Sequence, residues 1–99
     1  MNEPVEKEYK KMIIRAMNYH FPKAKVYLFG SRALGTHRPA SDIDIAIDEG
    51  KRADYGELYR ARITLENLPI PFFMDLVDMH AIPLELKEHI LKTGILWKS

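Results

Sequence analysis

Residues 42–47 have the sequence Asp-Ile-Asp-Ile-Ala-Ile, an unbroken alternation of isoleucine with acidic or small residues. Successive side chains of a β-strand point to opposite faces of the sheet. The three isoleucines therefore enter a core, whereas Asp42 and Asp44 share the opposite face with Ala46. Because a strand with one apolar face needs helices or a second sheet to cover it, the alternation predicts a sheet-based domain.

Two further apolar segments are short enough to be strands. Residues 25–29 (KVYLF) end at Gly30, and residues 72–77 (FFMDLV) follow Pro71. Short apolar segments that end at a glycine or follow a proline are typical of strands. Pattern alone leaves the strand directions open.

Three stretches carry apolar residues at helical spacing. The first spans residues 3–20, the second begins directly after Asp54, and the third runs from Pro83 to Gly94. Asp54 and Glu57 together resemble a capping box at the start of the second helix. The positions expected to face the core are Val5, Tyr9, Met12, Ile13, Ala16 and Met17, then Leu58, Ala61, Leu65 and Leu68, then Leu86, Ile90 and Leu91. With a short helical turn between the first two strands, the chain is predicted to be one α/β domain over residues 1–99.

Composition restricts the function classes. Fifteen Lys and Arg against fourteen Asp and Glu give a formal charge of +1, which argues against a general nucleic-acid binder. The absence of cysteine excludes thiolate zinc sites and favours a cytoplasmic protein. We expect no membrane helix and no signal peptide, because apolar runs are short and the N-terminus is charged. The four histidines lack metal-site spacing and are expected at the surface or at caps.

Asp42 and Asp44 stand about 6.6 Å apart on one strand face. Two carboxylates this close repel each other and are costly near a core unless a cation neutralises them. Mg²⁺ prefers carboxylate oxygens and keeps positions open for phosphate oxygens. The pair therefore indicates a divalent-cation site. The alternative is a solvated strand face with two acids, because Asp-x-Asp alone is a common pattern.

Asp75 is a third acid of interest because its neighbours in the strand are apolar. A carboxylate in the middle of such a strand needs a partner or a function. If this strand lies beside the acidic strand, Asp75 can face Asp42 and Asp44 across about 5 Å. The alternative is an edge strand that turns Asp75 to water. Asp78, at the strand end, is expected to be a turn or cap residue.

Gly30 and Ser31 follow the strand 25–29 directly. Glycine lets the backbone approach a ligand closely, and free N–H groups of the following turn can hold phosphate oxygens. The Ser31 hydroxyl can add a hydrogen bond, and Arg32 or Arg38 can add charge-assisted bonds. This segment is a candidate phosphate site. The alternative is an ordinary strand-to-turn connection with two surface arginines.

The combination is more specific than its parts. The segment LFGSRALGTHRPASDIDIAID resembles the signature of the DNA polymerase β-like nucleotidyltransferase superfamily, in which Gly-Ser is followed after about ten residues by Asp-x-Asp and by an acid on a later strand. Ten residues separate Ser31 from Asp42, and PFFMDLVD supplies Asp75. In its small size the chain resembles the minimal nucleotidyltransferases. These are the antitoxins of two-gene modules in which the second gene encodes an all-helical HEPN toxin.

The resemblance implies a two-layer α+β fold with a three-stranded mixed sheet and helices packed on one side. It also implies transfer of AMP from ATP to an acceptor hydroxyl, with two Mg²⁺ ions, for which Mn²⁺ can substitute, clamping the reacting oxygens. The implied catalytic and metal-binding residues are Asp42, Asp44 and Asp75, and those implied to bind the triphosphate are Gly30, Ser31 and Arg32.

A chain of 99 residues has no room for a separate acceptor domain, so we expect another protein or a second copy to complete the acceptor site. The resemblance implies that the acceptor is a tyrosine of a HEPN toxin. The apolar segments 68–73 and 95–97 belong to the core, to a partner surface or to a homodimer contact. Two other functions stay open. One is a non-catalytic nucleotide-binding module that masks a HEPN partner by contact, and the other is a small-molecule nucleotidyltransferase subunit of the aminoglycoside type.

Overall fold

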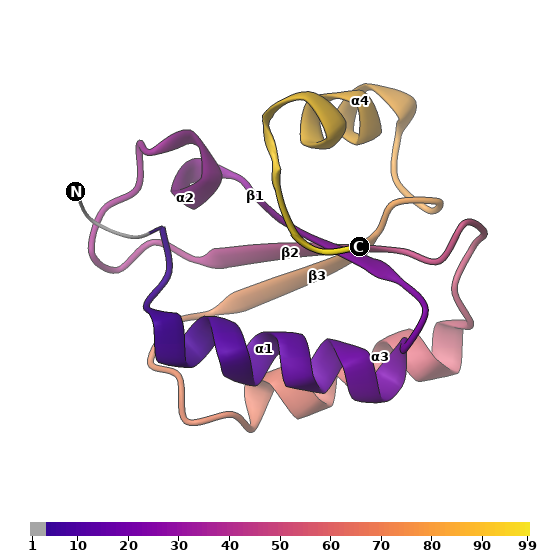
Figure 1. The fold of residues 1–99 in the computed structure, drawn as a ribbon, viewed down its shortest axis with the longest axis horizontal. Helices are drawn as coiled ribbons and strands as arrows, with labels where there is room; N and C mark the ends of the chain where they lie inside the picture. Colours follow the sequence, from indigo (N-terminus) through magenta and orange to yellow (C-terminus); the bar gives the residue numbers. More distant parts are fainter. Residues whose placement is uncertain (1–3) are drawn as a thin grey trace.

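The computed structural model describes residues 4–99. Along the chain its elements are α1 (Lys7–His20), β1 (Lys25–Phe29), α2 (Ser31–Leu34), β2 (Ile43–Asp48), α3 (Tyr55–Glu66), β3 (Met74–Asp78), α4 (Leu84–Thr93) and β4 (Ile95–Lys98) (Figure 1). The first seven follow the predicted order. None of the helices in the described part of the chain is long and apolar enough to cross a membrane.

The sheet is mixed, as predicted, but has four strands instead of three, in the order β3-β2-β1-β4. β1 is antiparallel to both of its neighbours, and β2 is parallel to β3. The additional strand arises because Gly94 passes directly from α4 into extended backbone with φ −72° and ψ 162°. A Cβ atom at Gly94 would lie 2.5 Å from the carbonyl oxygen of Ile90, so only glycine permits this tight exit.

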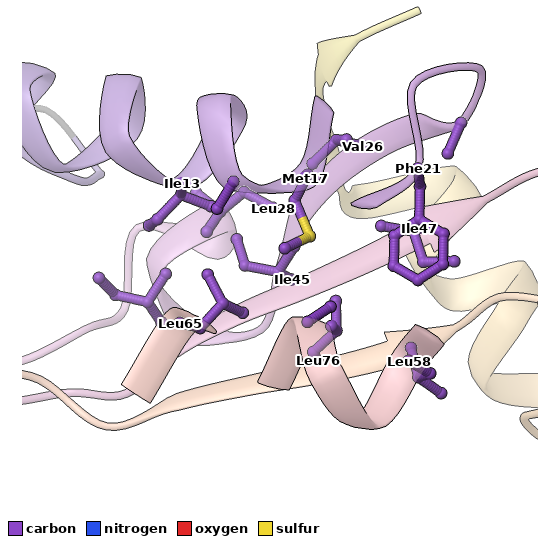
Figure 2. Packing of buried hydrophobic residues seen from close by; sticks show 14 of the residues in the cluster. Ile13, Met17, Phe21, Val26, Leu28, Ile45, Ile47, Leu58, Leu65 and Leu76 are labelled. Carbon is purple, nitrogen blue, oxygen red and sulfur yellow. The ribbon is translucent and has the colours of Figure 1, made fainter. Parts of the chain in front are cut away.

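Helices cover both faces of the sheet. The main core joins α1 and α3 to the face that carries Ile43, Ile45 and Ile47, as the alternation predicted (Figure 2). The second, smaller cluster lies on the opposite face, where Ile90 of α4 packs with residues of β1 and β2. The prediction of helices on one side therefore holds for α1 and α3 and is wrong for α4.

The ends and inward faces of the helices differ in detail from the prediction. α1 begins at Lys7 with Glu6 in the cap position, so Pro4 and Val5 precede the helix, and residue 3 lies outside the described residues. Val5 is nevertheless buried. In α4, Leu91 was expected to face the core but is 53% exposed, because the small second cluster is filled by Ile90 and its neighbours.

Asp54 caps α3 as predicted, since its carboxylate accepts a hydrogen bond from the Glu57 N–H at 2.9 Å. The Glu57 side chain does not complete the capping box. It lies 2.6 Å from Nδ1 of His20, whose Nε2 lies 2.7 Å from the Thr64 hydroxyl. Hydrogen bonding to His20 and then to Arg60 holds the pKa of Glu57 below its usual value. His20 is thus the last residue of α1 and links α1 to α3. Its side chain is only 6% exposed and the cap residue is Phe21, so the expectation of a surface or cap position is wrong for His20.

Candidate active site

The strand register brings the predicted acidic residues to one end of the sheet. Asp44 on β2 is paired with Phe29 on β1 and with Asp75 on β3. Because β1 runs antiparallel to β2, the carboxyl end of β1, where Gly30 follows, meets the amino ends of β2 and β3 beside α2 (Figure 1). Aligned residues of neighbouring strands share a face, so Asp44 and Asp75 point to the same side of the sheet.

Gly30 lies directly against the Asp44 carboxylate. A Cβ atom at Gly30 would lie 2.2 Å from Oδ2 of Asp44, a distance that no side chain can adopt. The Gly30 backbone has φ 78° and ψ −159°, a region that essentially only glycine occupies. Both the contact and the backbone conformation therefore require glycine here, and they place the Gly30–Ser31 turn next to an acid.

The electrostatics centre on Asp44, which is partly buried, whereas Asp42 and Asp75 are exposed. Burial, followed by the negative charges of Asp75 and Asp42, raises the pKa of Asp44 from 3.8 to about 6, against a smaller lowering by Arg32. Such crowding of carboxylates is typical of sites where a cation or substrate completes the charge balance. β3 is an edge strand, which explains how Asp75 faces both water and Asp44.

The raised pKa predicts that Asp44→Asn stabilises the domain at neutral pH. Between pH 3.8 and about 6 the folded protein keeps a proton on Asp44 that the unfolded chain releases, so stability falls as pH rises through this window. The rise in the pKa of Asp44 from 3.8 to about 6, discounted for partial exposure, corresponds to a destabilisation of about 1–2 kcal/mol at neutral pH. Urea unfolding without divalent cations should show this gain at pH 7.5 and none at pH 3.5. A gain of equal size at both pH values would contradict the assignment.

The residues at this end of the sheet fit a hard divalent cation by their chemistry. Asp42, Asp44 and Asp75 offer only carboxylate oxygens, the donors that Mg²⁺ prefers, and the missing Cβ of Gly30 leaves room beside Asp44. Among residues 4–99, however, no group of three or more His, Asp or Glu side chains is arranged so that it could hold a metal ion as it stands. The structure thus supplies suitable donors but not a closed coordination shell.

The predicted phosphate ligands fall into two groups. Ser31 is the first residue of α2 and is partly exposed beside Gly30. Arg32, in contrast, is buried and donates hydrogen bonds to the carbonyl oxygens of Ser41 and Pro4. This geometry is unfavourable for the contact with substrate that the sequence suggested, because the guanidinium points into the protein. Arg38 is exposed on the loop that follows α2.

Sequence reasoning missed two contributors to this region. The Ser41 hydroxyl accepts a hydrogen bond from the Arg38 N–H at 2.8 Å and so shapes the turn before Asp42. The Phe72 ring lies under Arg32 and beside Tyr9. A serine directly after a turn and an aromatic residue before a strand carry no distinctive sequence pattern, so only the spatial contacts identify them.

Asp78 has the structural role that the sequence predicted. Its carboxylate accepts hydrogen bonds from the N–H groups of Ala53 at 2.7 Å and His80 at 3.0 Å. His80 in turn lies 2.7 Å from the carboxylate of Asp48. These contacts tie the opposite end of the sheet together, away from Asp44.

Comparisons with known proteins identify the family of the chain. A model of the family described as Polymerase beta, Nucleotidyltransferase matches residues 11–99. One chain in a crystal structure of a toxin–antitoxin complex with AMP-PNP is 28% identical, with a TM-score of 0.76 over 89% of this chain and 71% of that one. A comparison with curated proteins finds no match.

Two further solved structures share the fold. A toxin–antitoxin complex of MntA and HepT has a TM-score of 0.72 at 24% identity, covering 93% of this chain and 71% of that one. One chain in a complex of a tri-AMPylated Shewanella oneidensis HEPN toxin with an MNT antitoxin has a TM-score of 0.73 at 23% identity, over 94% of this chain and 71% of that one. Since the family model matches residues 11–99, which is well over half of the chain, the chain belongs to the polymerase β nucleotidyltransferase family.

Proposed function

We propose that this chain is an antitoxin-type nucleotidyltransferase that transfers AMP from ATP to a tyrosine hydroxyl of a HEPN toxin. The observation that carries the proposal is the convergence of Gly30, Asp44 and Asp75 at one end of the sheet. Support for the nucleotide comes from the similar chain solved in a toxin–antitoxin complex with AMP-PNP. Support for the acceptor comes from the AMPylated HEPN toxin bound to a protein of the same fold.

In the proposed reaction the acceptor oxygen forms a bond to the α-phosphorus of ATP, the bond from that phosphorus to the bridging oxygen of the β-phosphate breaks, and pyrophosphate leaves. Asp42, Asp44 and Asp75 would hold Mg²⁺. When bound there, Mg²⁺ supplies positive charge that neutralises the triphosphate and makes the acceptor hydroxyl more acidic. Asp75, which is exposed on the edge strand, would take the proton of an incoming hydroxyl.

The Gly30–Ser31 turn would orient the β- and γ-phosphates. Its close approach to Asp44 brings backbone N–H groups and the Ser31 hydroxyl next to the carboxylates. The contribution of the protein is then mainly position and fixed charge, as is typical of phosphoryl transfer.

An apolar surface beside Asp75 supports the involvement of a protein partner. Phe73, two residues before Asp75, is 84% exposed. It borders a hollow of about 400 Å³ lined by residues of the segment 70–74 and the end of α3. A large exposed aromatic next to a polar site is typical of interaction surfaces. A partner seated there could bring a tyrosine to Asp75.

We expect ATP binding to depend on Mg²⁺ or Mn²⁺. Without a cation, the three carboxylates would repel the triphosphate. Burial and then the charges of Asp75 and Asp42 raise the pKa of Asp44, so further negative charge there is unfavourable. Titration calorimetry with ATP should give an affinity at least about tenfold higher with Mg²⁺ than with EDTA. Adenosine, which carries no phosphate, serves as the control and should be insensitive to the cation. Equal ATP affinity in both conditions would contradict the proposed site.

A further inference from the structure

Arg32 is a charged side chain that is only 3% exposed. A buried guanidinium is costly unless its N–H groups find acceptors. Here Nε and Nη2 donate to the carbonyl oxygen of Ser41 at 3.1 and 2.8 Å, and Nη1 donates to that of Pro4 at 2.9 Å. Nη2 also reaches the carbonyl oxygen of Pro39 at 3.5 Å. All three nitrogens are therefore engaged by backbone carbonyls.

These contacts join the segments that carry the site. Arg32 itself follows Ser31 in α2, and its partner Ser41 directly precedes Asp42. The guanidinium carbon lies 4.5 Å from the centre of the Phe72 ring, three residues before Asp75. One buried cation, covalently next to the Gly30–Ser31 turn, thus contacts the loop before Asp42 and the segment before Asp75.

We infer that Arg32 is a positioning residue that fixes the loop before Asp42 and the segment before Asp75 around the Gly30–Ser31 turn, and that it does not bind the triphosphate. To reach a phosphate, the guanidinium would have to give up its bonds to three carbonyl oxygens and its stacking on Phe72. Lysine cannot replace it, because one ammonium lacks the planar fork that bridges separate acceptors. The catalytic part of this inference rests on the proposed function, whereas the structural part does not.

The first test uses amide hydrogen exchange without nucleotide. In Arg32→Lys, the amides of Ser41 and Ile43, which donate to Arg38 and Phe73 carbonyls in the wild type, should exchange at least about tenfold faster. The amide of Leu58 in α3 should be unchanged. Arg52→Lys, at an exposed arginine, is the matched control and should alter none of these rates.

Phe72→Leu removes the ring beneath the guanidinium and keeps its hydrogen bonds. It should accelerate the Ile43 amide by a smaller factor, and it tests the same contact should Arg32→Lys be poorly folded. A uniform acceleration of all amides in both variants, or no change in either, would overturn the inference.

The second test separates positioning from substrate contact. Arg32→Lys should lower kcat for AMP transfer by about 10–100-fold, since displaced reacting groups lose rate, while the Kd for MgATP changes less than about threefold. A phosphate ligand would behave oppositely, because losing a charge-assisted bond weakens ATP binding by about tenfold or more. Weakened ATP binding with unchanged loop exchange would overturn the inference. If the wild type transfers no AMP, the proposed function fails and the exchange rates still decide the role of Arg32.

Discussion

Asp44→Asn is expected to lower AMP transfer to the HEPN partner by about a thousandfold or more while the domain stays folded. Asparagine keeps the size of Asp44 and one carbonyl oxygen, so packing against Gly30 and pairing with Asp75 are retained. It loses the negative charge that would hold Mg²⁺. Since a bound cation contributes several kcal/mol of transition-state stabilisation and each 1.4 kcal/mol is tenfold in rate, the loss of about three orders of magnitude follows.

The measurement is the intact mass of the partner after incubation with ATP, Mg²⁺ and either protein. Asp54→Asn is the matched control, because Asp54 is an exposed helix cap and asparagine caps equally well. We expect an added adenylate with the wild type and with Asp54→Asn, and none with Asp44→Asn. A mass gain with Asp44→Asn would show that the carboxylate is not catalytic.

The same experiment separates the alternative functions. A partner that is inhibited without any mass gain, by the wild type as well as by the variant, would favour a non-catalytic module that masks the toxin by contact. A wild type that neither modifies nor inhibits the partner, yet transfers AMP from ATP to small molecules, would favour the aminoglycoside-type function.

Local patterns predicted much of this structure. The alternation of residues 42–47 fixes which face of β2 is apolar, because side chains on a strand repeat every two residues. The Asp54 cap and the helical positions Leu58, Ala61 and Leu65 are likewise properties of short segments, and they were confirmed. Leu68, the fourth position of the predicted stripe, follows the end of α3 and is only partly buried. The sequence also predicted that Asp75 faces Asp44 if their strands are neighbours, and β2 and β3 are adjacent with Asp44 paired to Asp75.

The features that sequence could not supply depend on contacts between distant segments. β4 forms because the short tail after Gly94 finds a free edge of β1, and a four-residue strand gives a weak pattern. α4 crosses to the other face of the sheet to cover the small cluster around Ala46. The direction of Arg32 is decided by carbonyl oxygens and an aromatic ring up to 40 residues away, and a sequence shows only that a cation follows Gly-Ser.

Gly30→Ala is expected to lower the rate of AMP transfer by at least about a hundredfold and to destabilise the domain by about 2 kcal/mol or more. The added methyl group would lie 2.2 Å from Oδ2 of Asp44, so the carboxylate must leave its position. Alanine also strains the backbone at φ 78° and ψ −159°. Displacing a catalytic carboxylate by about 1 Å is enough to cost a hundredfold in rate.

Gly50→Ala is the matched control, because Gly50 has φ 82° but open space around its Cβ position. It should cost about 1 kcal/mol of stability from the positive φ and leave transfer unchanged. To isolate the contact with Asp44, urea unfolding of Gly30→Ala should be compared with Gly30→Ala/Asp44→Ala. Because removing the carboxylate removes the clash, the double variant should be more stable than additivity of the two single changes allows. Strict additivity, or full activity of Gly30→Ala, would show that the Gly30–Ser31 turn and Asp44 do not form one site.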